Sequence, residues 1–280
     1  MEKLNLTPSE SFLLLDIEKK DGKTLMKYGL INLLFKRVLV ANIRVVNEGT
    51  LFNRIVNKTY ISKGENFNDL NLKAHERVFY AVMFEKDELE LVELIKKIFE
   101  QYNYDDYYDL LINMQTQSGI LSVTEERKFF NIFSKKKKKL TQKGLEIKIK
   151  IKELLNQGNN NLSKWLAEDP GRAKAYMVAC GANLLLLDEN NIGLLKKYDK
   201  DLEEVDRLKH EDSGFLFWGD FTGAGLNGEA NGDLDSLSRD FNNISTFDSF
   251  DGLDSGFESA AVGDGSGCGG CSGCGGCGGG

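Results

Sequence analysis

The hydrophobic pattern at the start of the chain predicts two helices followed by a β-hairpin. Thr7, Pro8 and Glu10 mark a helix start, because Thr7 can cap the first amides, proline suits the first helical position and Glu10 completes a capping box. Apolar residues then recur at helical spacing, and two β-rich runs follow around a polar turn. The predicted elements are the helices Pro8–Glu18 and Lys23–Lys36 and the strands Val38–Val46 and Arg54–Ser62. We assign residues 1–65 to a winged-helix-like unit.

A similar order of elements recurs in the next part of the chain. Three helical patterns precede two short strand-like runs, which predicts a second winged-helix-like unit over residues 66–133. The predicted elements are the helices Leu72–Phe84, Asp87–Gln101 and Asp105–Gln117 and the strands Gly119–Val123 and Arg127–Phe133.

The remaining body is predicted to be helical. Residues 134–140 contain an unbroken lysine run and are interpreted as a polybasic linker. An amphipathic helix is predicted over Thr141–Gln157, and Asp169-Pro170 marks the start of an apolar helix that ends near Leu187. A last helix, Glu189–His210, completes a helical subdomain over residues 141–210.

Residues 211–280 differ in composition from everything before them. They hold 19 of the 29 glycines, so they are predicted to form a disordered tail. Four large aromatic residues at the start of this tail are expected to dock on the body; they are Phe215, Phe217, Trp218 and Phe221. The predicted fold class is therefore α+β and mainly helical, with two winged-helix-like units, a C-terminal helical subdomain and a tail.

The net charge also changes sign after residue 210. Residues 211–280 contain twelve acidic residues and one arginine, a net charge of −11, so the total of −7 leaves +4 on the first 210 residues. The acidic tail is interpreted as solvating, with contact to its own basic body as the alternative. No run of apolar residues is long enough for a membrane span or a signal peptide, so we expect a cytoplasmic protein.

Several motifs in order resemble a known family. They are LTPSESFLLLD (6–16), AHERVFYAVMF (74–84), LTQKGLEIKIKIKELL (140–155) and WLAEDPGRAKAYMVACGANLLLLDE (165–189). With the Gly-rich end, this order resembles the cytoplasmic C-terminal region of a family of uncharacterised predicted bacterial membrane proteins with Gly/Ser-rich tails. The lysine run stands where that family has membrane spans, so the chain looks like a soluble relative. A weaker likeness, in FLLLDIEKKDGK (12–23) and ACGAN (179–183), is to Golgi phosphoprotein 3-like lipid-binding proteins.

Residues suited to catalysis or nucleotide binding are scarce. No glycine-rich phosphate loop follows a predicted strand, and His75 and His210 are the only histidines. His75 is expected to be packed or at the surface. Asp105, Asp106 and Asp109 begin the helix that would enter a DNA groove, where carboxylates would oppose phosphates. We therefore expect no enzyme activity and no sequence-specific nucleic-acid partner.

Two features are candidate binding sites. The lysine run, Lys135, Lys136, Lys137, Lys138 and Lys139, is a candidate anion-binding site for phosphates, a membrane surface or the tail, with a solvated linker as the alternative. The tail ends in four cysteines three residues apart, Cys268, Cys271, Cys274 and Cys277. Four thiolates can hold zinc or Cu(I), but the same cysteines suit a tail-modifying enzyme or stay reduced and free. Cys180 is expected to be a buried small residue.

These observations favour a non-catalytic interaction or scaffolding protein that presents its Cys/Gly-rich tail to a protein partner, a metal or a modifying enzyme. The alternative is a peripheral adaptor that binds anionic lipids through the lysine run without spanning the membrane.

Overall fold

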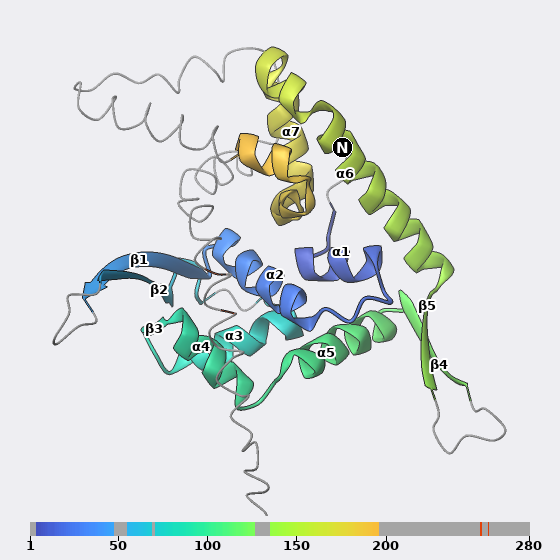
Figure 1. The fold of residues 1–280 in the computed structure, drawn as a ribbon. Helices are drawn as coiled ribbons and strands as arrows, with labels where there is room; N and C mark the ends of the chain where they lie inside the picture. Colours follow the sequence, from blue (N-terminus) through green and yellow to red (C-terminus); the bar gives the residue numbers. More distant parts are fainter. Residues whose placement is uncertain are drawn as a thin grey trace, which may run out of the picture.

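The computed structural model describes residues 4–47, 55–68, 71–126, 135–195, 253 and 257. Within these residues the fold is α+β and mainly helical, with two small antiparallel sheets (Figure 1), so the predicted fold class is confirmed at this level. The elements are α1 Pro8–Leu15, α2 Gly22–Phe35, β1 Leu39–Asn47, β2 Ile55–Lys63, α3 Ala74–Phe84, β3 Glu88–Glu90, α4 Leu91–Phe99, α5 Tyr104–Gln117, β4 Leu121–Glu126, β5 Lys135–Leu140, α6 Gln142–Glu168, α7 Pro170–Cys180 and the 3₁₀ helix η1 Gly181–Leu186.

The first helix begins where the capping signal places it. The hydroxyl of Thr7 accepts a hydrogen bond from the amide of Glu10, the Glu10 carboxylate accepts one from the amide of Thr7, and Pro8 is the first helical residue. This satisfies two of the amides that a helix start leaves without partners. Asp21 caps α2 in the same way through the amide of Thr24.

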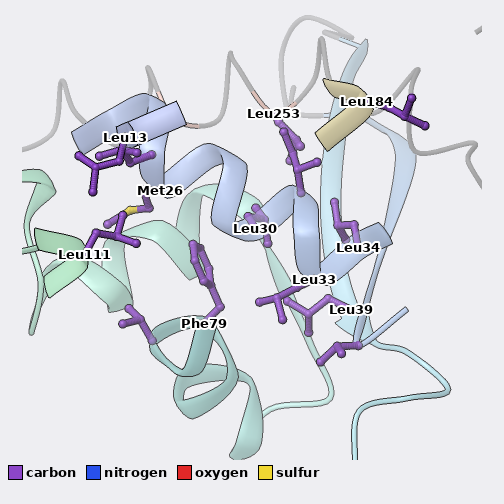
Figure 2. Close-up of a cluster of buried hydrophobic side chains, with 14 of the residues drawn as sticks. Leu13, Met26, Leu30, Leu33, Leu34, Leu39, Phe79, Leu111, Leu184 and Leu253 are labelled. Carbon is purple, nitrogen blue, oxygen red and sulfur yellow. The ribbon is translucent and has the colours of Figure 1, made fainter. Parts of the chain in front are cut away.

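Helix α2 is the centre of the hydrophobic core. Its apolar residues point in all directions, which is the pattern of a helix covered on every side. Figure 2 shows its leucines and Met26 among side chains from α1, α3 and α5, including Leu13, Phe79 and Leu111. Since this cluster joins residues on both sides of position 65, the two predicted winged-helix-like units share one core.

The larger sheet also crosses that predicted boundary. Its order is β1-β2-β3, and β3 pairs antiparallel with β2 through Ile61 opposite Leu89. The predicted helix Asp87–Gln101 was therefore wrong at its start, where residues 88–90 form a strand and α4 begins only at Leu91. Pairing with a distant strand outweighs the local helical pattern here.

The lysine run is a strand and not the predicted linker. β5 pairs antiparallel with β4, with Leu121 opposite Leu140 at the base of the hairpin. Farther out, the register pairs Glu125 with Lys136 and Glu126 with Lys135. The predicted strand Arg127–Phe133 lies outside the described residues.

Helices α6 and α7 pack against each other. α6 is longer than predicted and continues through Gly158 to Glu168. The glycine allows a close contact between the helices, because a Cβ at Gly158 would meet the hydroxyl of Tyr176 on α7 at 2.0 Å. Asp169 ends α6 and caps α7 at the amide of Arg172, as the Asp169-Pro170 signal predicts. The predicted continuation to Leu187 changes at Gly181 into η1, because Gly181 has a φ of 53°.

Residues after α7 and η1 are described only in part. The predicted last helix is helical over residues 189–195, and its remainder lies outside the described residues. The same holds for the four tail aromatics that were expected to dock, Phe215, Phe217, Trp218 and Phe221. In the tail, Leu253 and Phe257 are helical and fully buried, so the predicted disorder of the tail was wrong at these two positions.

A glycine fixes the hairpin to α6, which leads to a first prediction. A Cβ on Gly144 would lie 2.3 Å from the backbone oxygen of Ile120, which cannot rotate away. We expect Gly144→Ala to lower the free energy of unfolding by about 1–3 kcal/mol in urea titrations. The matched control is Gly171→Ala on α7, where the new Cβ would make an ordinary 3.7 Å contact with Asp169. That variant should be neutral or slightly stabilising, and equal stability of the two variants would contradict the proposed crowding.

Candidate functional site: a basic face and a buried charge network

The predicted anion-binding lysines lie on strand β5, next to the N-terminal end of α6 (Figure 1). Side chains alternate along a strand, and the structure shows this alternation in the run. Lys138 points towards the body, with its Nζ 4.1 Å from the ring centroid of Tyr108. Lys137 and Lys139 are exposed, and they therefore lie on the opposite face of the hairpin. The side chains of Lys135 and Lys136 are outside the described part of the structure.

The first half of α6 continues the positive charge with an apolar ridge. Leu145 and Ile149 are four residues apart, so they lie on one side of the helix, and they are 46% and 55% exposed. Lys148 and Lys152 are at the same helical spacing along one flank of this ridge. We call Lys137, Lys139, Lys148, Lys152, Leu145 and Ile149 together the basic face.

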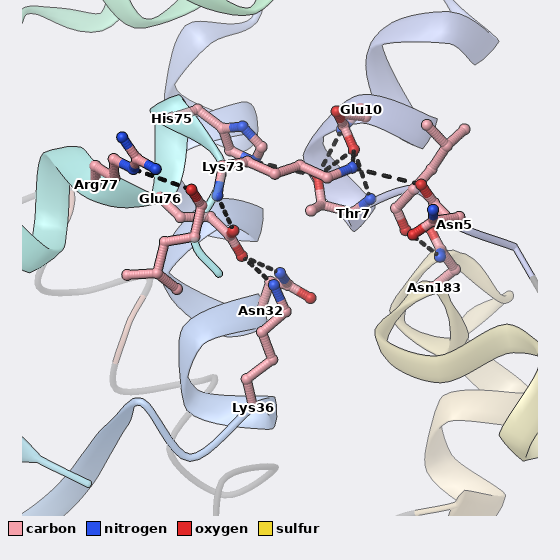
Figure 3. Close-up of polar contacts among 12 residues, drawn as sticks. Asn5, Thr7, Glu10, Asn32, Lys36, Lys73, His75, Glu76, Arg77 and Asn183 are labelled. Atoms are coloured by element: carbon pink, nitrogen blue, oxygen red, sulfur yellow. Dashed lines mark hydrogen bonds and ion pairs between the residues drawn. The ribbon is translucent and has the colours of Figure 1, made fainter. Parts of the chain in front are cut away.

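A second cluster of charges is buried beneath the N-terminal segment (Figure 3). Glu10 lies at its centre, with a side chain only 4% exposed, and its carboxylate pairs with Lys73 at 2.5 Å. The same carboxylate accepts a hydrogen bond from the Gln115 side chain at 3.0 Å. Burial alone would raise the pKa of Glu10, but Lys73, His75 and the hydrogen bonds outweigh it and lower the pKa below its ordinary value.

Glu76 forms the second half of this buried charge network. Its side chain is fully buried, and one carboxylate oxygen accepts hydrogen bonds from Asn32 at 2.5 Å and from Lys36 at 2.7 Å. The other oxygen accepts the backbone amide of Lys73 at the start of α3. Both buried carboxylates thus have a cation and further donors, which is the arrangement that a buried charge requires.

His75 lies between the two carboxylates. Its Nε2 is 3.1 Å from the hydroxyl of Thr7, and its Nδ1 has no hydrogen-bond partner among the described residues. Burial lowers the pKa of His75 to about 4, although Glu10 and Glu76 favour its protonation. The ring is therefore neutral at pH 7. It is packed inside the body, one of the two locations expected from the sequence.

Two cavities open on either side of the N-terminal segment Leu4–Leu6. The first, of about 720 Å³, is lined by α2, the start of α3 and η1, and the second, of about 920 Å³, lies between α5 and α6. Lys73 lines both of them. Asn183 holds the segment in place by donating a hydrogen bond to the backbone oxygen of Leu6 at 2.9 Å. The cavities therefore share one wall, and the buried charge network lies beneath it.

The first cavity is polar, and its charges are balanced. In the first cavity Lys36, Lys73 and Arg37 each have a carboxylate partner, which are Glu76, Glu10 and Glu65 respectively. His75 is not among the residues that line either cavity. The network thus holds the N-terminal segment, α1 and α3 together, and its charges are already used in that role.

The predicted cysteine site cannot be placed, because Cys268, Cys271, Cys274 and Cys277 all lie outside the described residues. Within the described residues, no group of three or more His, Cys, Asp or Glu side chains is arranged to hold a metal ion. Cys180 is buried, as expected, and burial raises its pKa to about 12, so that it is a neutral thiol at pH 7.

The acidic start of α5 has structural partners. Asn103 caps the helix and the Asp106 carboxylate accepts a hydrogen bond from the amide of Asn103, while Asp105 pairs with Lys20 at 2.7 Å. Carboxylates at a helix N-terminus also interact favourably with the helix dipole.

Sequence reasoning found the lysine run but not the buried charge network. Its members come from α1, α2, α3 and α5, and Glu10 is 63 positions from Lys73 and 105 from Gln115. Charged residues are normally exposed, so nothing local marks these as buried. One signal for this network was present in the sequence. The capping box places the Glu10 carboxylate at a helix start next to the core, where it can both cap the helix and bind a buried cation.

Comparisons with known proteins do not assign the chain to a family. No family model matches the chain, and a search of curated proteins finds no match. Among the described residues, no helix combines the length and apolar composition needed to cross a membrane.

Proposed function

We propose that this chain is a non-catalytic interaction protein whose body binds an anionic membrane surface and whose tail is held out to a partner. The observation that carries the membrane part is the basic face, which has exposed lysines on β5 and α6, the partly exposed Lys148, and two exposed apolar side chains on α6. The likeness to Golgi phosphoprotein 3-like lipid-binding proteins supports the same role.

The two kinds of side chain in the basic face have complementary effects at a membrane. Lysines are attracted to anionic headgroups by about 1 kcal/mol each. Leucine and isoleucine gain free energy when they leave water for the boundary between headgroups and acyl chains. Leu145 and Ile149 are half-exposed on a helix whose other large apolar residues are buried or partly buried, so their exposure fits a surface that is covered in the bound state.

The tail part of the proposal rests on composition. Residues 211–280 present four cysteines to a protein partner or a tail-modifying enzyme, with zinc or Cu(I) as the metals that such a thiolate set would take. A cytoplasmic setting, in which thiols stay reduced, is part of this proposal. Two winged-helix-like units are the finer description of the body, supported by the order of its helices and hairpins, and DNA is not the proposed partner.

The membrane proposal predicts binding that depends on the lysines of β5. The full chain should sediment with vesicles that contain phosphatidylserine and remain in solution with vesicles of phosphatidylcholine alone. Replacing Lys137 and Lys139 together by Gln should weaken this binding by roughly tenfold to thirtyfold, because two lysine contributions are lost. Vesicle sedimentation across a lipid titration measures the change.

The matched control removes two lysines elsewhere. Lys164→Gln with Lys174→Gln carries the same change in charge at the far end of α6 and on α7, and this variant should bind like the unmodified chain. Replacing Leu145 and Ile149 by Asn should also weaken binding, and at high salt this loss should persist while the lysine contribution fades. Equal effects of both lysine variants would indicate a response to net charge and would refute the basic face.

A further inference from the structure

Two residues of the acidic tail are part of the hydrophobic core of the body. Leu253 and Phe257 are both helical and both 0% exposed. Residues four positions apart on a helix lie on the same side of it. Figure 2 shows Leu253 in the same buried cluster as Leu30 and Leu34 of α2 and Leu184 of η1. Tail and body are therefore in direct contact at this point.

The body side of this contact is built from rigid elements. The hydroxyl of Tyr104, the first residue of α5, donates a hydrogen bond to the backbone oxygen of Phe257 at 3.3 Å. The Tyr104 ring packs edge-on against Phe99, with ring centroids 4.8 Å apart. The backbone carbonyl of Tyr104 lies close to Gly22 at the start of α2. A Cβ on residue 22 would be only 2.0 Å from that carbonyl oxygen. Helices α2, α4 and α5 thus fix the position of the donor.

We propose that the body carries a docking site for a short amphipathic helical segment with Leu and Phe four residues apart, and that the chain's own Leu253 and Phe257 occupy it. The recognised chemistry is an apolar pair on one helix face, with one hydrogen bond to the backbone. Acidic residues flank the pair in the sequence at Asp251, Asp254 and Glu258, while the body carries a net positive charge. The burial of both side chains and the hydrogen bond from Tyr104 identify this segment as the occupant.

Docking determines how far the cysteines can move. From Phe257 to Cys268 there are few residues, and even a fully extended chain of that length reaches only about 40 Å. Without docking, the last described body residue before the tail, Leu195, would be connected to Cys268 by more than seventy residues. Docking thus shortens the tether between the body and Cys268 from more than seventy residues to eleven, and a partner with the same Leu and Phe pattern would lengthen it again.

The experiment uses a fluorescein-labelled peptide with the sequence of residues 248–262 and measures its anisotropy with the full chain. In the unmodified chain the tail competes at the millimolar effective concentration of a tethered segment. We expect the variant Leu253→Asp/Phe257→Asp, whose own segment cannot dock, to bind the peptide at least tenfold more tightly. A peptide with the same two aspartates should bind neither protein. This inference is independent of the basic face, because no residue of that face takes part.

Two control variants distinguish release of the docked segment from the general effect of substitutions in the tail. The variant Phe247→Asp/Phe250→Asp changes two other tail aromatics and should bind the peptide as weakly as the unmodified chain. The milder variant Phe257→Leu should give an intermediate gain, which protects the test if the double aspartate variant unfolds. Equal peptide binding by all four proteins would overturn the proposal. So would a concentration-dependent dimer that Leu253→Asp/Phe257→Asp abolishes, because the occupant would then be a second copy of the chain.

Discussion

Acidification from pH 7 to pH 4 should remove about 3 kcal/mol of the free energy of unfolding through His75 alone. The pKa of this buried side chain is about 4 in the folded protein and 6.5 in the unfolded chain. Between these values the unfolded state binds a proton that the folded state does not. The contribution of His75 is therefore fully present above about pH 6.5 and is lost as the pH falls towards 4.

The measurement compares urea unfolding of the unmodified chain and of His75→Gln at both pH values. Glutamine has a similar length and cannot take up a proton, while Glu10, Glu76, Lys73 and Lys36 remain around it in both proteins. The variant should be less stable at pH 7. Its free energy of unfolding should, however, fall by about 3 kcal/mol less between pH 7 and pH 4 than that of the unmodified chain. If both proteins lose the same amount, the imidazole is accessible to protons in the folded state.

Local signals predicted the parts of the fold that local physics determines. The capping box at Thr7 and the Asp169-Pro170 start each place a helix at the observed residue, because caps act within a few positions. The strand at Glu88–Glu90 was missed because β2 defines it through pairing. The lysine run was interpreted as a linker for the same reason, since strand β4 supplies its partners. The predicted helix Thr141–Gln157 was too short, because Gly158 lies inside α6 and makes a close contact with Tyr176.

The candidate sites also contain some features that local sequence predicts and others that depend on packing. A run of lysines is visible in any sequence, so the basic face was predictable in part, but the exposure of Leu145 and Ile149 is not, because an amphipathic pattern normally implies burial. The pairing of Glu10 with Lys73 depends on how α1 and α3 pack. Leu253 and Phe257 had a weak signal, an apolar pair at helical spacing among glycines and aspartates, which general expectations for such tails outweighed.

The largest loss of stability should follow from removing the cation of the buried Glu10–Lys73 pair. Lys73→Met leaves the carboxylate of Glu10, which is 4% exposed, with the Thr7 amide and Gln115 but no positive charge beside it. A buried charge that loses its partner typically costs about 3–5 kcal/mol, and we expect a decrease of this size in the free energy of unfolding. Urea titrations at pH 7 measure it.

Two comparison variants identify the cause of that loss. Lys164→Met breaks a pair with Glu168 whose side chains are 68% and 66% exposed, 3.7 Å apart, and this change should cost at most about 1 kcal/mol. Glu10→Gln combined with Lys73→Met leaves no unpaired charge, so the double variant should be more stable than Lys73→Met alone. If Lys73→Met costs no more than Lys164→Met, water reaches Glu10 in the folded protein. If the double variant is the less stable one, lost packing and not an unpaired charge explains the effect, because only the carboxylate charge is relieved when glutamine replaces Glu10.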